Sequence, residues 1–91
     1  MSITIKNLEA AFAGESQAFT KYMYFAKLAR AEGFEDVAEH FEHTASQELL
    51  HAHGHLELLI GKPGVKQSLE MAIAGETYEL VVIDRLIFII L

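Results

Sequence analysis

The chain has 91 residues, which is enough for one small domain and too few for two independently stable cores. Its formal net charge is -6 and its seven basic residues are scattered, so it offers no basic stripe for nucleic acid. Cysteine is absent from these residues, which excludes disulfides, thiolate chemistry and Cys-ligated iron within them. A metal would therefore bind through carboxylate and imidazole groups.

The composition predicts an all-α fold. Apolar residues make up 52% of the chain, Pro occurs once, and most of the sequence is rich in the helix formers Ala, Leu, Glu and Lys. A helical hairpin of this size buries little surface, so we expect its apolar faces to be covered in a homodimer or a higher homo-oligomer.

The two ends of the sequence predict no membrane attachment. The first residues lack the positive flank and apolar core of a signal peptide, which favours a cytoplasmic location. Residues 81–91 are apolar at nine of eleven positions, yet this tail is too short to span a bilayer. Charged residues interrupt any longer window, namely Glu76, Glu79, Asp84 and Arg85. We interpret residues 81–91 as an atypical apolar tail that is buried or covered by a partner.

A first helix is predicted from near Thr4 to about Glu32, where Gly33 offers a left-handed stop. Its apolar residues recur at steps of three and four, and Glu15 falls inside the stripe that they form. The stripe consists of Leu8, Ala11, Phe12, Phe19, Tyr22, Ala26 and Ala29.

A second helix is predicted from near Phe34 to about Ile60, before the breaker Gly-Lys-Pro-Gly at residues 61–64. Its period places Glu48, His51 and His55 on or beside the apolar face. A third helix is predicted to begin with Ser68 as its cap and to carry Glu76 and Glu79. From residue 80 onward β-branched residues dominate, so helix and strand compete there.

A short internal repeat suggests duplicated helical hairpins. Ala-Gly-Glu-Ser at residues 13–16 recurs as Ala-Gly-Glu-Thr at residues 74–77, an offset of 61 residues. The second copy stops before an equivalent of the second helix, so the repeat is incomplete within this sequence.

Inward-facing carboxylates point to a metal site. A carboxylate in a dry core costs several kcal/mol unless it is protonated, paired or metal-bound. Glu15 on the first helix, with Glu48 and His51 at i and i+3 on the second, would give two oxygen ligands and one nitrogen ligand. This set suits iron or manganese, and zinc also accepts these ligands.

Several of these residues also have simpler interpretations. Glu-x-x-His alone is a weak signal; an inward Glu15 and Tyr22 on the same face of the preceding helix strengthen it. Glu15 could instead be a partly exposed edge residue, and Tyr22 could be simple core, a hydrogen-bond donor to a ligand or a redox-active neighbour. His55 could donate a hydrogen bond behind the site or be a plain histidine. Glu79 could be a further ligand or an ordinary polar residue. His40, His43 and His53 are interpreted as surface residues.

Five segments, taken together in order and spacing, resemble the ferritin-like domain of rubrerythrins. They are residues 7–18, 22–26, 31–34, 48–52 and 73–79, and the resemblance covers about residues 4 to 80. It implies a carboxylate-bridged di-iron centre that reduces hydrogen peroxide by two electrons. It also implies that Tyr22 lies beside the cluster and that the iron ligands are Glu15, Glu48, His51, Glu76 and Glu79.

The sequence departs from this family after about residue 80. Family members continue with a fourth helix that bears a further Glu and His, and many add a Cys-rich rubredoxin domain; residues 80–91 resemble neither. We therefore interpret residues 1–91 as a single partial domain whose four-helix bundle is completed by a second chain. Two copies would supply Glu15, Glu48 and His51 twice, the ligand count of a di-iron site.

The resemblance favours a di-iron peroxidase that receives electrons from an external, rubredoxin-like protein and acts on hydrogen peroxide or dioxygen. Two other functions fit the same residues. One is an iron-binding or ferroxidase module of the ferritin kind, and the other is a metal-free helical oligomerisation module.

Overall fold

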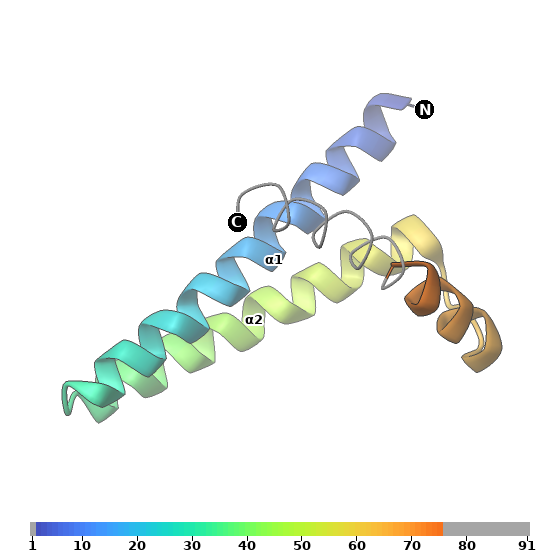
Figure 1. Cartoon of the computed structure of the whole chain (residues 1–91). Coiled ribbons are helices and arrows are strands. Elements are labelled where there is room, and N and C mark those ends of the chain that lie inside the picture. The colour runs from blue at the N-terminus through green and yellow to red at the C-terminus, as the bar shows by residue number, and fades with distance from the viewer. Residues whose placement is uncertain (1, 76–91) are drawn as a thin grey trace, which may run out of the picture. The chain divides into compact units, whose positions relative to one another are not determined.

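The computed structural model describes residues 2–75, with side chains from residue 4 onward. Helix α1 (Ser2–Ala31) and helix α2 (Glu35–Ile60) run antiparallel and form a hairpin (Figure 1). A third helical segment spans residues 65–75, and no strand occurs among residues 2–75. This confirms the all-α prediction, and the bounds of both long helices agree with the predicted ones to within two residues.

The turn between α1 and α2 is a Schellman motif followed at once by a new helix. The backbone N–H of Phe34 donates to the Ala29 carbonyl at 2.9 Å, and that of Gly33 donates to the Arg30 carbonyl at 3.0 Å. Gly33 has φ +87°, the left-handed conformation predicted for the helix stop. The Phe34 carbonyl then accepts the first bond of α2, from the N–H of Ala38 at 3.0 Å. One residue thus closes α1 and opens α2, which fixes the tight return of the chain.

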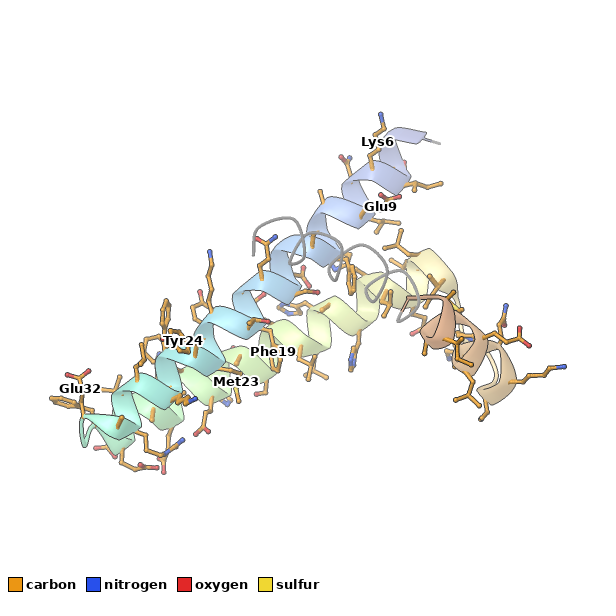
Figure 2. The ribbon with its side chains drawn as sticks, viewed as in Figure 1. Lys6, Glu9, Phe19, Met23, Tyr24 and Glu32 are labelled. Carbon is orange, nitrogen blue, oxygen red and sulfur yellow. The ribbon has the colours of Figure 1, made fainter. Side chains whose placement is uncertain are left out.

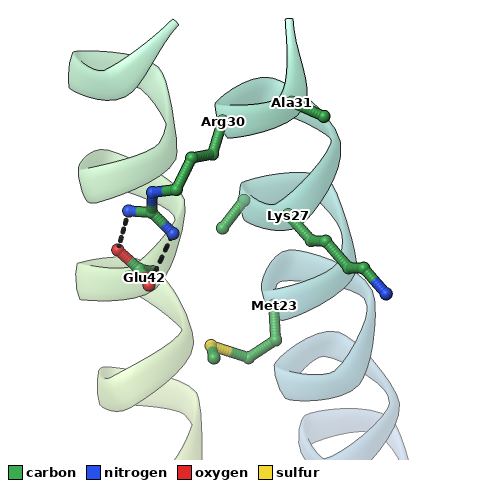
Figure 3. A pocket seen from close by; sticks show the side chains of 6 residues that line it. Met23, Lys27, Arg30, Ala31 and Glu42 are labelled. Carbon is green, nitrogen blue, oxygen red and sulfur yellow. Dashed lines mark hydrogen bonds and ion pairs between the residues drawn. The ribbon is translucent and has the colours of Figure 1, made fainter. Parts of the chain in front are cut away.

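Arg30 joins the two helices beside this turn. Its guanidinium donates to both carboxylate oxygens of Glu35 at 3.0 to 3.1 Å and to both of Glu42 at 2.8 and 3.2 Å. The contact with Glu42 is drawn in Figure 3, at the edge of a shallow groove also lined by Met23 and Lys27. A cation in the last turn of α1 and an acid in the first turn of α2 also complement the dipoles of their helices.

The buried part of the hairpin consists of alanines. Ala38, Ala45 and Ala52 are buried on α2 at a spacing of seven residues, and Ala26 and Ala29 are buried on α1. Alanine carries a single methyl group, which lets the two helices approach closely. A buried methylene-sized group contributes only about 0.8 kcal/mol. The seam therefore sets the geometry of the hairpin but stabilises it weakly.

Three aromatic rings pack beside the alanine seam near the turn. The ring of Tyr22 stacks on that of Phe41 with centroids 6.1 Å apart, and the ring of Phe25 meets Phe41 edge to face at 5.5 Å. Such ring pairs are favourable beyond the area that they bury. This cluster locks the register of α1 against α2 at the end of the hairpin that holds the turn.

Large apolar side chains remain exposed on the hairpin. Phe25 is 40% exposed, Leu28 43% and Leu50 70%, and among the described residues no large side chain is fully buried. Polar residues such as Lys6 and Glu9 extend from the first turns of α1, and Glu32 from its far end (Figure 2). The hairpin thus leaves much of its apolar surface without cover from within residues 4–61.

The chain after α2 forms a separate unit that begins at Lys62. Gly61 ends α2 with φ +72°, and its N–H donates to the Glu57 carbonyl at 2.8 Å. The next helical segment begins at Val65, so the prediction that Ser68 caps it was wrong. The N–H of Ser68 already donates to the Gly64 carbonyl at 2.8 Å, which places Ser68 inside the first turn.

Some predicted features lie beyond the third helical segment, and another prediction concerns membrane attachment. Glu76, Glu79 and the apolar tail 81–91 lie outside the described residues. Within residues 2–75, no helix combines the length and the hydropathy that crossing a bilayer requires.

The left-handed turn gives a prediction about stability. Gly33→Ala should lower the free energy of unfolding by about 1 to 2 kcal/mol, because an L-residue pays roughly this amount at positive φ. Gly54→Ala is the matched control, because a Cβ added there meets no atom within 4 Å and Gly weakens a helix interior. It should raise stability by about 0.5 to 1 kcal/mol. Urea unfolding at one fixed protein concentration measures both, and equal effects would contradict the assigned turn.

The contact between Arg30 and Glu42 gives a prediction about pH. Hydrogen bonds from Arg30 lower the pKa of Glu42, a partial desolvation opposes them, and the Arg30 charge adds to the lowering. A lowered folded-state pKa stabilises the fold above the unfolded pKa of about 4.3, and this stabilisation disappears as the pH falls through the folded-state value. Glu42→Gln should therefore lower the thermal midpoint of metal-free protein slightly at neutral pH and not in strong acid.

The control for this comparison is Glu39→Gln, which changes an exposed carboxylate on the same helix. Circular dichroism melts of both variants and the parent, taken across the acid range, measure the effect. If Glu42→Gln lowers the thermal midpoint by the same amount in acid as at neutral pH, the contact stabilises the fold through packing and not through charge.

Candidate metal centre

Three of the predicted ligands meet in the middle of the hairpin. Glu15 of α1 and Glu48 and His51 of α2 each offer one ligand atom, and these atoms all lie within 4.8 Å of one another. Glu15 and Glu48 are half-buried, whereas His51 is exposed. Two carboxylate oxygens and one imidazole nitrogen thus converge from both helices of one chain.

The periodicity of the two helices explains this convergence. Glu15 precedes Tyr22 by seven residues on α1, and Glu48 follows Phe41 by seven residues on α2. Because Tyr22 stacks on Phe41, the residues two turns further along both helices are also brought face to face. The aromatic cluster and the candidate ligands therefore lie about two helical turns apart on the same faces of the two helices.

His55 adds a second imidazole to this region. Its Nδ1 atom lies 3.2 Å from each carboxylate oxygen of Glu15 and 3.0 Å from the backbone carbonyl of His51. The sequence left the role of His55 open. Its spacing, seven residues after Glu48 and four after His51, is the signal that places it on the same face.

The remaining predicted site residues lie elsewhere or have other contacts. Tyr22 is half-buried among Phe25 and Phe41, so its role beside a metal stays a prediction. The predicted ligands Glu76 and Glu79 lie outside the described residues. The histidines interpreted as surface residues are exposed, namely His40, His43 and His53.

The chemistry of the donor set fits iron. Carboxylates can bridge two cations and neutral imidazole fills a terminal position, a combination that suits iron, manganese or zinc. A single hairpin offers three such ligand groups within the described cluster, which is half of the six that a di-iron site in a helical bundle uses. The residues present therefore fit one half of such a centre.

The chain is similar in sequence to proteins of one family. Residues 6–67 match the family model described as Rubrerythrin. The chain is 41% identical to Rubrerythrin of Porphyromonas gingivalis in an alignment of 91 positions, gaps included, that covers 86% of this chain and 46% of that protein. It is 54% identical to Nigerythrin of Nitratidesulfovibrio vulgaris over 48 residues, or 53% of this chain and 24% of the relative. Rubrerythrin of the same organism is 49% identical over 51 residues, 56% of this chain and 27% of the relative.

The chain thus spans less than half the length of each of these relatives. The family match includes both long helices from residue 6 onward, and it contains all three residues of the Glu15, Glu48 and His51 cluster. The all-α hairpin is the ferritin-like helical fold that the sequence predicted. The match and the fold together show that this chain belongs to the rubrerythrin family.

Proposed function

We propose that this chain forms part of a di-iron oxidoreductase that reduces hydrogen peroxide with electrons from an external donor. The observation that carries the proposal is the convergence of Glu15, Glu48 and His51 to within 4.8 Å between two helices. Membership of the rubrerythrin family favours iron over manganese or zinc for this donor set. A cytoplasmic location is part of the same proposal.

The three residues would have different roles in holding the metals. Glu48 would be the carboxylate shared between the two ions, and Glu15 and His51 would be terminal ligands, because a carboxylate has two oxygens to share whereas an imidazole offers one nitrogen. When bound, the iron pair supplies the two electrons that peroxide reduction requires. The protein holds the ligands on rigid helices, and the half-buried position of both carboxylates limits access of water to them.

A second copy of the chain completes the site in this proposal. Three ligand groups from each of two hairpins give four carboxylates and two imidazoles. The exposure of His51 and of Phe25 supports this, because a single hairpin leaves a candidate ligand and a large apolar side chain accessible to a partner. The result is a four-helix bundle with the metals on or near its two-fold axis. Glu76 and Glu79 are the competing source of the missing ligands.

Electrons reach the site from outside these residues. The 91 residues contain no Cys and hence no ligands for a rubredoxin-type iron centre. We therefore assign electron delivery to a rubredoxin-like protein that docks on the assembled bundle. Dioxygen is the alternative oxidant.

The metal and the activity are tested with one pair of variants. Glu48→Gln keeps the volume of the side chain and removes a bridging carboxylate, so it should abolish stoichiometric iron binding. With iron, a rubredoxin-type donor, its reductase and a nicotinamide, the parent should consume many equivalents of peroxide per site. The variant should show at least a hundredfold slower turnover, the order of effect expected when essential metal chemistry is lost. Iron content and nicotinamide oxidation measure the two effects.

The matched control is Glu39→Gln, an exposed glutamate on the same helix, which should keep both iron and turnover. Peroxide consumption that stops after a few equivalents per iron, even with the donor present, would favour an iron-handling module. Equal iron in Glu48→Gln and the parent would exclude the proposed ligand role. A parent that binds no iron would leave the metal-free oligomerisation module.

The shared site is tested with mixed dimers. A tagged chain with Glu15→Ala and His51→Ala, combined with the parent chain, should give heterodimers whose site has lost half of its terminal ligands and binds iron at least tenfold more weakly. The control chain carries Glu9→Ala and His53→Ala, two exposed positions on the same two helices. Iron per purified heterodimer is the measurement. Full loading of the parent subunits, or an iron-bound monomer, would return the missing ligands to Glu76 and Glu79.

A further inference from the structure

His55 presents one ring nitrogen to two groups of the candidate metal centre. Its Nδ1 lies 3.2 Å from Oε1 and 3.2 Å from Oε2 of Glu15 on the facing helix. The same atom lies 3.0 Å from the backbone carbonyl of His51, one turn earlier on its own helix. The imidazole therefore spans from the backbone of one candidate ligand to the carboxylate of another.

These contacts determine which nitrogen carries the proton. A backbone carbonyl and an ionised carboxylate are acceptors only, so a hydrogen bond to either requires a proton on Nδ1. His55 is therefore a donor at Nδ1. Its lone pair, in the neutral ring, lies on Nε2.

The contact between His55 and Glu15 is partly shielded from water. The side chain of His55 is 31% exposed and that of Glu15 is 21% exposed, so water competes for the contact less than at an open surface. The contact of Nδ1 with the His51 carbonyl restricts the orientation of the ring. A glutamate side chain is otherwise free to adopt many rotamers, and a fixed donor restricts it.

We propose that His55 is a positioning residue that holds the Glu15 carboxylate by a hydrogen bond from Nδ1–H. The proposal rests on the metal function proposed above and extends it, because it names the group that orients a ligand before the metal arrives. Groups that orient metal ligands in this way typically change metal affinity by ten- to a hundredfold when they are removed. Because Nδ1–H of His55 donates to Glu15 and to the His51 carbonyl, His55 affects metal affinity through Glu15.

The test compares three classes of variant in metal-free protein titrated with Co²⁺ alone. His55→Leu removes the N–H donor and replaces the ring by an apolar side chain of similar volume. His55→Asn places an amide N–H near the position of Nδ1. His55→Leu should bind Co²⁺ about tenfold more weakly, and His55→Asn should recover affinity to within about threefold of the parent. His53→Leu and His53→Asn, at an exposed position on the same helix, should match the parent. Visible absorption of bound Co²⁺ reports the affinity, and circular dichroism confirms that each variant is folded.

The outcomes separate the inference from the function on which it rests. If the parent binds Co²⁺ and His55→Leu binds it equally well, the positioning role is overturned and the metal site stands. If His55→Asn is as weak as His55→Leu, the donor role is overturned in favour of direct ligation by the ring. If the parent binds no Co²⁺ and no Fe²⁺, the metal function and this inference both fail.

A second measurement needs no metal. Nitrogen NMR of the histidine side chains in metal-free protein should show His55 as the Nδ1–H tautomer and should show this signal shifted in Glu15→Gln. An Nε2–H tautomer for His55 would overturn the proposal.

Discussion

The close approach of α1 and α2 along their buried alanines is the constraint on which the rest of the hairpin depends. Ala38, Ala45 and Ala52 repeat every seven residues, so one line of α2 stays against α1 along most of its length. Side chains that flank this line are then forced into contact across the seam. Near the turn the flanking side chains are aromatic, and two turns away they are Glu15 and Glu48. The same geometry builds the packing layer and the candidate metal site.

The hairpin gives up stability at the positions of its candidate metal ligands. A leucine buried at the place of Glu15 or Glu48 would contribute about 1.5 to 3 kcal/mol, whereas a carboxylate there must be paired or bound to a metal. His55 provides Glu15 with such a partner in the described structure. Departures from the ordinary rules of core composition are expected where a site is held between rigid elements. Here the residues that depart from these rules, Glu15 and Glu48, both flank the alanine seam.

In our proposal, the exposed apolar surface and the half-complete ligand set have one explanation, namely that further helices pack on this hairpin. A seam of single methyl groups stabilises weakly, and large side chains such as Phe25 and Leu28 stay accessible beside it. Further helices placed there would remove this apolar surface from water and add ligands opposite His51. Assembly and metal binding are thus coupled in our proposal. Metal affinity should then depend on protein concentration as well as on the identity of the ligands.

The sequence by itself determined the helical class, both long helices and the left-handed turn at Gly33, because apolar period and glycine conformation are local properties. It also selected Glu15, Glu48 and His51, since helical spacing puts each on or beside the apolar face of its helix. Tertiary structure alone decided that these three meet, because that depends on the register of α1 against α2. It likewise placed the His55 ring against the Glu15 carboxylate, since a contact across 40 residues of sequence has no local signature.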